Sequence, residues 1–161
     1  MKLKFFTTGG TIDKIYFDAK GEYAIGEPQV ATLLADVNTG FEYEIESLLR
    51  KDSLDLTAAD RALIRERVAA ETATQIVITH GTDTMIQTAQ ALRDIPGKTI
   101  VLTGAMQPAR MRVTDAGFNL GAAVAAVQTL PAGVYIAMNG RIFNPENSRK
   151  NVAAHRFEEI K

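Results

Sequence analysis

Short apolar runs alternate with segments of helical periodicity along this chain, and that alternation leaves few folds open to it. Residues 75–78 and 99–102 are continuous apolar runs, as expected of strands that are covered on both faces. Helical patterns occupy residues 84–92, between these runs, and residues 115–128, after them. We therefore predict an α/β fold with an open, mostly parallel sheet and helices on both faces.

The remaining elements follow from local patterns. Residues 57–71 should form a helix, because Thr57 and Asp60 have the spacing of a capping box, and this helix should bury Leu63, Ile64 and Val68. Further strands are expected at residues 3–6, 41–46 and 133–138, and a helix at residues 28–37 with Pro28 in its first turn.

The polar segment 144–161 has only three apolar anchors, Val152, Phe157 and Ile160. We see no linker, internal repeat or low-complexity segment. Residues 1–161 are therefore interpreted as a single domain.

Charge and composition exclude several classes of function. A formal net charge of −1 over 161 residues gives no electrostatic footprint for nucleic acid or an anionic membrane. No apolar run approaches the roughly 20 residues of a membrane helix. With no cysteine and only two histidines, a disulfide framework and a zinc site are both disfavoured. We expect a cytoplasmic protein without a metal.

Glycines and hydroxyls follow three of the predicted strands, at residues 7–11, 79–84 and 103–106. Ligands of open α/β sheets bind outside the carboxyl ends of the parallel strands, so these loops predict a site. The first loop matches neither the dinucleotide pattern nor the P-loop pattern, and Thr11 then becomes a candidate nucleophile if a base activates its hydroxyl. A tight turn that only caps the next helix is the alternative for each loop.

The loop at residues 79–84 reads Thr-His-Gly-Thr-Asp-Thr. We expect a helix to begin at Thr82 and Asp83, where either side chain would serve as N-cap, and where free N–H groups favour a substrate carboxylate. His80 lies on the strand side of the loop, so we interpret it as a structural hydrogen-bonding residue rather than as a catalytic one.

Two of these motifs, Thr8-Gly9-Gly10-Thr11-Ile12 and His80-Gly81-Thr82-Asp83-Thr84-Met85, closely resemble the two threonine signatures of the bacterial-type L-asparaginase/glutaminase family. Residues 103–108 and 115–120 also resemble that family, so the similarity covers nearly the whole chain. The resemblance implies hydrolysis of asparagine or a related small amide through a threonine acyl-enzyme, without metal or cofactor.

The resemblance also implies roles for individual residues. Thr11 resembles the attacking threonine, and Tyr23 resembles the loop tyrosine that polarises its hydroxyl, with Tyr16 as the weaker match. Lys150 resembles the lysine of a Thr-Lys-Asp group with Thr82 and Asp83, either as proton acceptor or as orienting group. The substrate-binding positions implied in the same way are Gly10, Ser53, Gly81, Thr82, Asp83 and Ala105, with Ser53 at the α-carboxylate and Asp83 at the amino group.

Two departures from the family leave alternatives open. Proteins of the family are roughly twice as long, and the 161 residues contain no counterpart of their second, smaller domain, so we expect a site that is open on one side. Leu54 stands where the family often has a polar substrate contact. A non-catalytic module that binds an amino acid or carboxylate is therefore the alternative to an amidohydrolase. We also expect a homo-oligomer, with a dimer favoured and packed on the small residues at 121–126.

Overall fold

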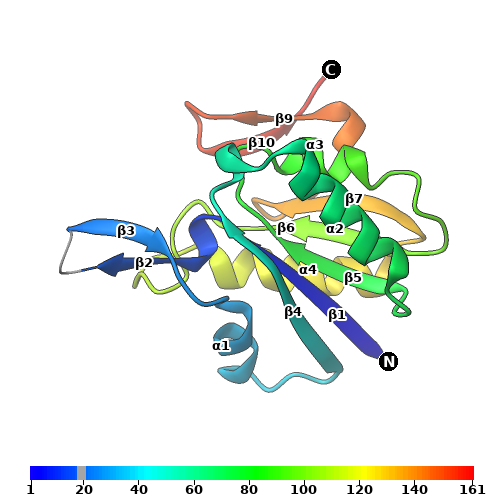
Figure 1. The fold of residues 1–161 in the computed structure, drawn as a ribbon, viewed down its shortest axis with the longest axis horizontal. Coiled ribbons are helices and arrows are strands. Elements are labelled where there is room, and N and C mark those ends of the chain that lie inside the picture. The colour runs from blue at the N-terminus through cyan, green and yellow to red at the C-terminus, as the bar shows by residue number, and fades with distance from the viewer. Residues whose placement is uncertain (18–20) are drawn as a thin grey trace.

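A computed structural model describes residues 1–17 and 21–161 of the chain. Its centre is a six-stranded sheet in the order β4-β1-β5-β6-β7-β8 (Figure 1). The first five strands in that order are parallel, and β8 pairs antiparallel with β7. The predicted open, mostly parallel sheet is confirmed. Its strands are β1 (Lys2–Gly9), β4 (Glu42–Lys51), β5 (Gln75–Thr79), β6 (Thr99–Thr103), β7 (Gly133–Met138) and β8 (Arg141–Phe143).

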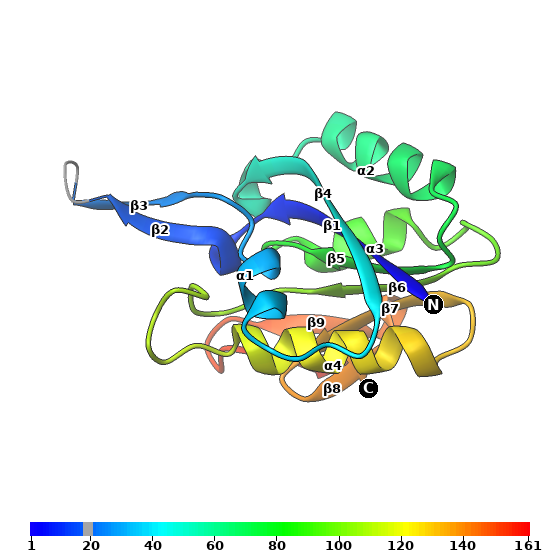
Figure 2. The same ribbon diagram turned by 90° about the horizontal axis from the view of Figure 1, so that it is seen from below.

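Helices cover both faces of this sheet, as predicted. In Figure 2, α2 (Ala58–Ala70) and α3 (Met85–Ala91) lie on one side of the strands, and α4 (Ala116–Thr129) lies on the other. The short helix α1 (Val30–Ala35) belongs to the same apolar core as α4. None of the helices in the described ranges is long and apolar enough to cross a membrane.

The continuous apolar runs are explained by this two-sided burial. On β5, Ile76 and Ile78 belong to the core under α2 and α3, whereas Val77 between them belongs to the core under α4. On β6, Ile100 and Leu102 alternate with Val101 in the same way. Successive side chains of a strand point to opposite faces, so a strand that is covered twice needs apolar residues throughout.

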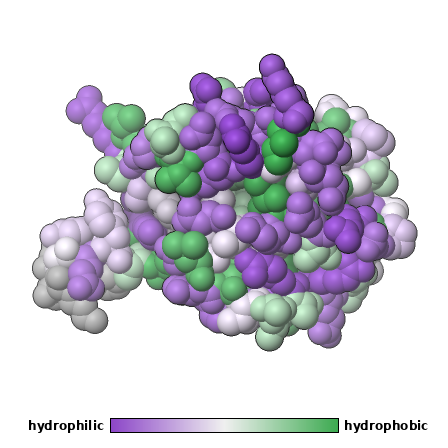
Figure 3. All heavy atoms as spheres, turned by 90° about the horizontal axis from the view of Figure 1, so that it is seen from above, coloured by the Kyte–Doolittle hydropathy of each residue, from purple (hydrophilic) through white to green (hydrophobic). Residues whose placement is uncertain are grey.

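Two antiparallel hairpins form separate two-stranded sheets beside the central sheet. The first pairs β2 (Lys14–Phe17) with β3 (Glu22–Ile25), and it projects from the body of the molecule (Figures 1 and 3). The second pairs β9 (Ser148–Asn151) with β10 (Arg156–Glu159) and lies close to α3. Three single-turn 3₁₀ helices complete the described elements, at η1 (Thr11–Asp13), η2 (Ser53–Asp55) and η3 (Pro145–Asn147).

Some local expectations hold and others are wrong. The capping box of α2 is present, with reciprocal bonds between Thr57 and Asp60. Ile64 and Val68 are fully buried as expected, but Leu63 is 39% exposed, because it lies about 100° around the helix from the buried stripe. The helix expected at residues 28–37 begins only at Val30.

In the polar segment that ends the chain, the prediction of three apolar anchors is wrong for two of them. Only Phe157 is buried, with its ring centroid 6.1 Å from that of Phe143, whereas Val152 and Ile160 are exposed. On α4, Ala123 and Ala126 pack against the sheet, and Gly121 and Ala125 face solvent. The expected dimer face at residues 121–126 is therefore only partly available.

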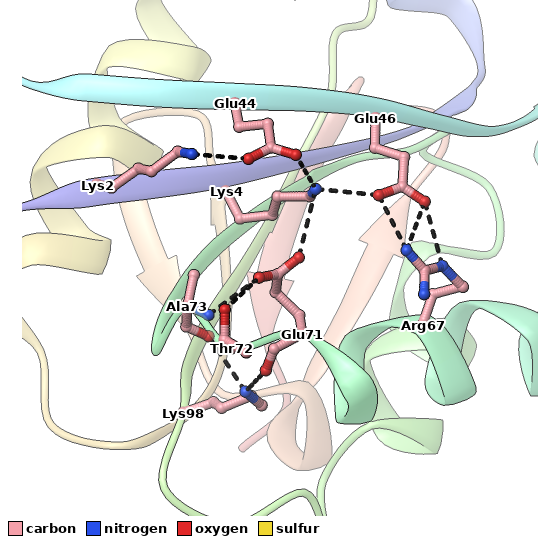
Figure 4. Close-up of polar contacts among 9 residues, drawn as sticks. All are labelled: Lys2, Lys4, Glu44, Glu46, Arg67, Glu71, Thr72, Ala73 and Lys98. Atoms are coloured by element: carbon pink, nitrogen blue, oxygen red, sulfur yellow. Dashed lines mark hydrogen bonds and ion pairs between the residues drawn. The ribbon is translucent and has the colours of Figure 1, made fainter.

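A network of charged side chains lies near the start of β1, beside the end of α2 (Figure 4). The Lys4 side chain is only 5% exposed, and its ammonium lies 2.9 Å from Glu44, 3.0 Å from Glu46 and 3.3 Å from Glu71. Arg67 of α2 forms a bidentate pair with Glu46, and Lys2 pairs with the other oxygen of Glu44. The network thus ties β1 to β4 and to the end of α2.

The same contacts set the protonation of the network. Burial of Lys4 opposes its charge, but its hydrogen bonds to the three glutamates raise its pKa above the usual value. Hydrogen bonds from Lys2 and Lys4 lower the pKa of Glu44 to about 2. The network therefore contributes stability that is complete above the ordinary carboxyl pKa, and that contribution is lost as the pH falls toward 2.

We predict that Lys4→Met lowers the free energy of unfolding by about 1–3 kcal/mol at pH 7, because Glu71 and its neighbours lose their buried partner. Lys2→Met is the matched control: its pair with Glu44 is exposed, so it should lose much less stability than Lys4→Met. Urea unfolding of both variants from pH 7 to pH 3 measures this. The difference between Lys4→Met and wild type should shrink as the pH falls, and equal losses in the two variants would contradict the prediction.

Candidate active site

The loops that follow β1 and β5 touch through their backbones. A Cβ atom added to Gly10 would lie 2.4 Å from both the Cα and the nitrogen of Gly81, which is closer than any side chain permits. Gly10 also has a φ of 85°, and its N–H donates to the carbonyl of Lys51 at the end of β4. Only glycine satisfies both conditions, so the first glycine-rich loop is built for close approach.

The neighbouring loops pack on this contact from two sides. A Cβ atom on Gly81 would lie 2.7 Å from the Cβ of Ser53, at the start of η2. On the other side, a Cβ on Gly104, after β6, would lie 2.3 Å from the carbonyl oxygen of His80. The loops after β1, β5 and β6 therefore meet at one edge of the sheet, together with η2.

A lysine from the far end of the chain reaches this edge. The ammonium of Lys150 donates to the Thr82 hydroxyl at 2.7 Å and to an Asp83 carboxylate oxygen at 2.6 Å. The Lys150 side chain is 15% exposed and that of Asp83 is 39% exposed, so the ion pair borders solvent. Thr82 itself is buried. These three residues form a connected Thr-Lys-Asp group.

The β9–β10 hairpin delivers Lys150 to the group. Lys150 lies on β9, directly opposite Phe157 of β10, and Phe157 packs into the core against Phe143. Ser148, at the start of β9, is also buried. The one apolar anchor of the polar segment thus positions the strand whose lysine reaches Thr82.

The helix expected at Thr82 and Asp83 begins later than predicted. Helix α3 starts at Met85, its N-cap is Thr84, and no side chain caps it. The Thr84 hydroxyl donates to the Ser53 carbonyl at 2.8 Å, and the Thr84 N–H donates to the Ser53 hydroxyl at 3.3 Å. Because Thr84 is held by η2, Thr82 and Asp83 form a turn that faces Lys150 instead of capping the helix.

The threonine hydroxyls of the three loops differ in their hydrogen-bond partners. Thr8 donates to the Thr79 carbonyl, and Thr103 donates to the Ala137 carbonyl, so both serve the backbone where strands end. Thr11 is half-buried at the start of η1, immediately after the Gly10 contact, and Thr82 binds Lys150. Thr84 donates to the Ser53 carbonyl, whereas the hydroxyls of Thr7 and Thr79 are buried and have no hydrogen-bond partner among the described residues. Thr11 and Thr82 are the loop threonines that the two sequence motifs mark as site residues.

Two of the predicted site residues lie apart from this group. Tyr23 is 54% exposed on the projecting hairpin and packs edge-on against Tyr16, with ring centroids 5.5 Å apart. Among the described residues, no hydrogen bond links Tyr23 to Thr11 or Thr82. Ala105 follows Gly104 and is buried against Ile12, so it forms the floor behind the first loop.

Sequence reasoning missed a buried carboxyl beside Thr11. Asp13 is 1% exposed, and its carboxylate accepts from the Gln29 N–H at 2.9 Å. Its backbone carbonyl also accepts from Gly26 at the end of β3, so Asp13 joins η1 to the base of the projecting hairpin. Burial raises its pKa to about 7, against the opposing effects of the Gln29 N–H and Arg50. The position of this acidic residue between two apolar residues, Ile12 and Ile15, was the sequence signal that it is buried.

This geometry can be compared with known proteins. Residues 2–159 match the model of the family described as "Asparaginase, N-terminal". The chain belongs to the asparaginase family. The match extends over nearly all of the residues, so it includes both threonine motifs and the Lys150 strand.

Several relatives of this asparaginase-family chain are known by name. It is 35% identical to a glutaminase-asparaginase from Acinetobacter glutaminasificans over 68% of the chain and 34% of the relative. It is 32% identical to an L-asparaginase from Thermococcus kodakarensis over 88% of the chain and 45% of the relative. A solved structure of the thermostable L-asparaginase from Thermococcus kodakarensis superposes with a TM-score of 0.85 at 30% identity, covering 99% of the chain and 51% of the relative.

A relative of a second kind is a glutamyl-tRNA(Gln) amidotransferase component from Pyrobaculum aerophilum. The chain is 37% identical to it over 81% of the chain and 33% of the relative. The chain thus spans from a third to about half of the length of these relatives.

We predict that Gly10→Ala separates the first two loops, because its Cβ would collide with the Gly81 backbone and its φ of 85° is strained for alanine. The expected loss is on the order of 1–3 kcal/mol of unfolding free energy. Gly117→Ala is the control: nothing lies within 4 Å of its Cβ in α4, so it should be neutral or stabilising by about 0.5–1 kcal/mol. Thermal melting compares the two variants. A Gly10→Ala variant that melts at the wild-type temperature would contradict the close approach of the Gly10 and Gly81 backbones.

We also predict a pH signature of Asp13. Its raised pKa means that the folded state holds a proton which the unfolded state releases, so its contribution to stability falls as the pH rises from about 4 to about 7. Asp13→Asn keeps the acceptor for Gln29 and should gain stability relative to wild type across that window. Denaturant titrations at pH 4, 5.5 and 7.5 measure it, with exposed Asp36→Asn as control. A constant difference between Asp13→Asn and wild type would refute it.

Proposed function

We propose that this chain is an amidohydrolase that converts asparagine or a related small amide to the acid and ammonia through a threonine acyl-enzyme. The observation that carries the proposal is the Lys150–Thr82–Asp83 group beside the Gly10–Thr11 turn. A module that only binds a ligand does not need a hydroxyl held by a lysine together with a second threonine on the adjoining loop. Membership of the asparaginase family supports the same reaction class.

In this proposal Thr11 is the nucleophile. Its hydroxyl oxygen bonds to the amide carbon as the hydroxyl proton leaves, and the carbon–nitrogen bond then breaks as the nitrogen gains a proton and departs as ammonia. Water cleaves the resulting ester, which releases the acid and restores Thr11. A threonine hydroxyl is a weak nucleophile at neutral pH, so a neighbouring group must accept its proton. Tyr23 is proposed to polarise the Thr11 hydroxyl, and the hairpin that carries it would have to approach Thr11.

Lys150 and Asp83 fix the direction of the Thr82 hydroxyl. An ammonium has donors and no acceptor, so the Thr82 oxygen accepts from Lys150 and presents its own proton elsewhere. Asp83 holds the ammonium at 2.6 Å and keeps it aligned. We propose that Thr82 is thereby oriented toward the substrate, where it takes part in proton transfer at the leaving nitrogen and at the attacking water.

Ser53 and Asp83 are the proposed contacts for the charged ends of an amino-acid substrate. Ser53 touches Gly81 and is bonded to Thr84, so its position is fixed relative to Thr82. Gly10, Gly81 and Ala105 would form the wall against which the substrate lies. We also propose that residues 1–161 act as one domain and that this domain forms a homo-oligomer, with a dimer favoured. No cofactor is required by this chemistry.

The test is ammonia release from asparagine, glutamine and simple amides. Thr11→Val and Thr82→Val should each lower kcat/KM by roughly 10² to 10⁴, the range for loss of a proton-transfer partner. Lys150→Met should lose activity as well, because methionine keeps the apolar stem of the side chain and removes its charge. Arg149→Met is the matched control on the same strand, since Arg149 is exposed and pairs with Glu158 away from Thr82.

Three results would count against the proposal. Full activity in either threonine variant removes the assigned roles. Equal activity of Lys150→Met and Arg149→Met would show that Lys150 has no role in the reaction. If wild type binds asparagine by calorimetry but releases no ammonia from any amide, the chain is a binding module instead.

A further inference from the structure

The ring of His80 lies behind the Thr82 turn and is fully buried. Its Nδ1 is 2.6 Å from the carbonyl oxygen of Gly81, and its Nε2 is 2.8 Å from the hydroxyl of Thr88 on α3. The Nε of Arg61, on α2, is 3.2 Å from that same hydroxyl. The four groups form one chain that leads from α2 to the backbone of the candidate active site.

The chemistry of the chain fixes the direction of every bond in it. A carbonyl oxygen only accepts, so Nδ1 of His80 must carry a proton and donate it to Gly81. Arg61 only donates, so the Thr88 oxygen accepts from it. The remaining contact joins the Thr88 hydroxyl to Nε2, and a neutral ring with its proton on Nδ1 has a bare Nε2 that accepts from Thr88. For a neutral ring, the tautomer with its proton on Nδ1 is the one in which all four groups make their hydrogen bonds.

The surroundings keep the ring neutral. Burial lowers the pKa of His80 to about 4, and Arg61 acts in the same direction, whereas the bond to the Gly81 carbonyl acts against it. A cationic ring would also bring a second positive donor to the Thr88 oxygen beside Arg61, and it would leave the Thr88 proton without Nε2 as its acceptor. Burial and bonding partners therefore favour the same neutral form.

We propose that His80 is a positioning residue, locked as the Nδ1–H tautomer by the chain Arg61→Thr88→His80→Gly81, and that it sets the orientation of the Gly81–Thr82 peptide in the active site. This inference rests on the proposed function for its catalytic consequence. It goes beyond that function because it assigns His80, Thr88 and Arg61, which do not touch the substrate, to the geometry of Thr82.

The consequence follows from peptide planarity. In a trans peptide the C=O and the following N–H point in opposite directions, so holding the Gly81 carbonyl on the His80 ring turns the Thr82 N–H away from it. Within the described residues, the Thr82 N–H has no hydrogen-bond partner. His80 thus holds a free backbone donor and the Thr82 side chain in one fixed orientation.

Nitrogen NMR of the full chain tests the tautomer without any assay of activity. Only His80 and His155 contribute imidazole signals, and His155 is exposed, so His155→Gln leaves the His80 ring alone in the spectrum. We expect the directly bonded proton on Nδ1, a bare Nε2, and no change of form between pH 5.5 and 8. A proton on Nε2, or a cationic ring in that range, would overturn the proposal.

Paired substitutions test the positioning. In His80→Asn the amide nitrogen lies near the position of Nδ1, so a donor for the Gly81 carbonyl is kept. In His80→Gln the longer side chain extends toward Thr88, and the donor for the Gly81 carbonyl is lost. We expect His80→Asn to keep at least about tenfold more kcat than His80→Gln, the rate equivalent of one hydrogen bond. His80→Gln should lose about 10²-fold, the cost of a misplaced catalytic group. Thr88→Ser should have a higher kcat than Thr88→Val, because only serine keeps the hydroxyl that bonds to His80.

The backbone amide signals of Thr82 and Asp83 give a readout that separates the two proposals. They should shift in His80→Gln and stay near their wild-type positions in His80→Asn. If wild type hydrolyses no amide, the proposed function fails, and the tautomer and these signals still decide the role of His80. If both variants shift the signals equally, or lose equal activity, His80 is a packing residue and the positioning role is wrong.

Discussion

The site depends on the contact between two backbones, Gly10 after β1 and Gly81 after β5. Parallel strands in a sheet are about 4.8 Å apart, and side chains normally keep the loops beyond them further apart. Without side chains at these positions, the loops converge until the Cβ position of Gly10 falls 2.4 Å from Gly81. Thr11 and Thr82 directly follow these two glycines on the converging loops. Ser53 and Gly104 then pack against the same point, so the geometry of the whole edge follows from it.

Periodicity predicts the fold well where burial is two-sided. The inner positions of β5 and β6, residues 76–78 and 100–102, are all apolar because α2 and α3 cover one face and α4 the other. Where burial is one-sided or local, pattern alone is weaker. Leu63 has the right chemistry for the core but the wrong angle on α2, and Val152 and Ile160 are exposed because the β9–β10 hairpin needs only Phe157 to anchor it. The start of α3 depends on Ser53, which is 31 residues distant from Thr84 and invisible to local rules.

The same limit applies to the site. Strand ends rich in glycine and hydroxyls predicted the edge at which the loops meet, but they did not tell which hydroxyls the backbone uses. Thr8 and Thr103 prove to be bonded to carbonyls, and that distinction needs the register between strands. The contact of Lys150 with Thr82 spans 68 residues, so its prediction came from family resemblance and not from spacing. Asp13, Thr88 and Arg61 were missed because their partners are distant in sequence or are backbone atoms.

The buried polar groups near the sheet obey one rule, and it determines the electrostatics at Thr82. Lys4 keeps its charge because three carboxylates surround it at the opposite end of β1. His80 has a carbonyl and a hydroxyl as partners, and burial leaves it neutral; Asp13, bonded to one N–H, holds its proton up to about pH 7. The side chain bonded directly behind the turn, His80, is therefore uncharged, and the Arg61 cation is held off by the Thr88 hydroxyl between them. The ion pair of Lys150 with Asp83 then remains in direct contact with Thr82, and its field is not offset by a charged histidine on the other side. The Thr82 hydroxyl is thus bonded to the charged Lys150 in front, while the Gly81 carbonyl behind it is bonded to the neutral ring of His80, two hydrogen bonds away from the Arg61 cation.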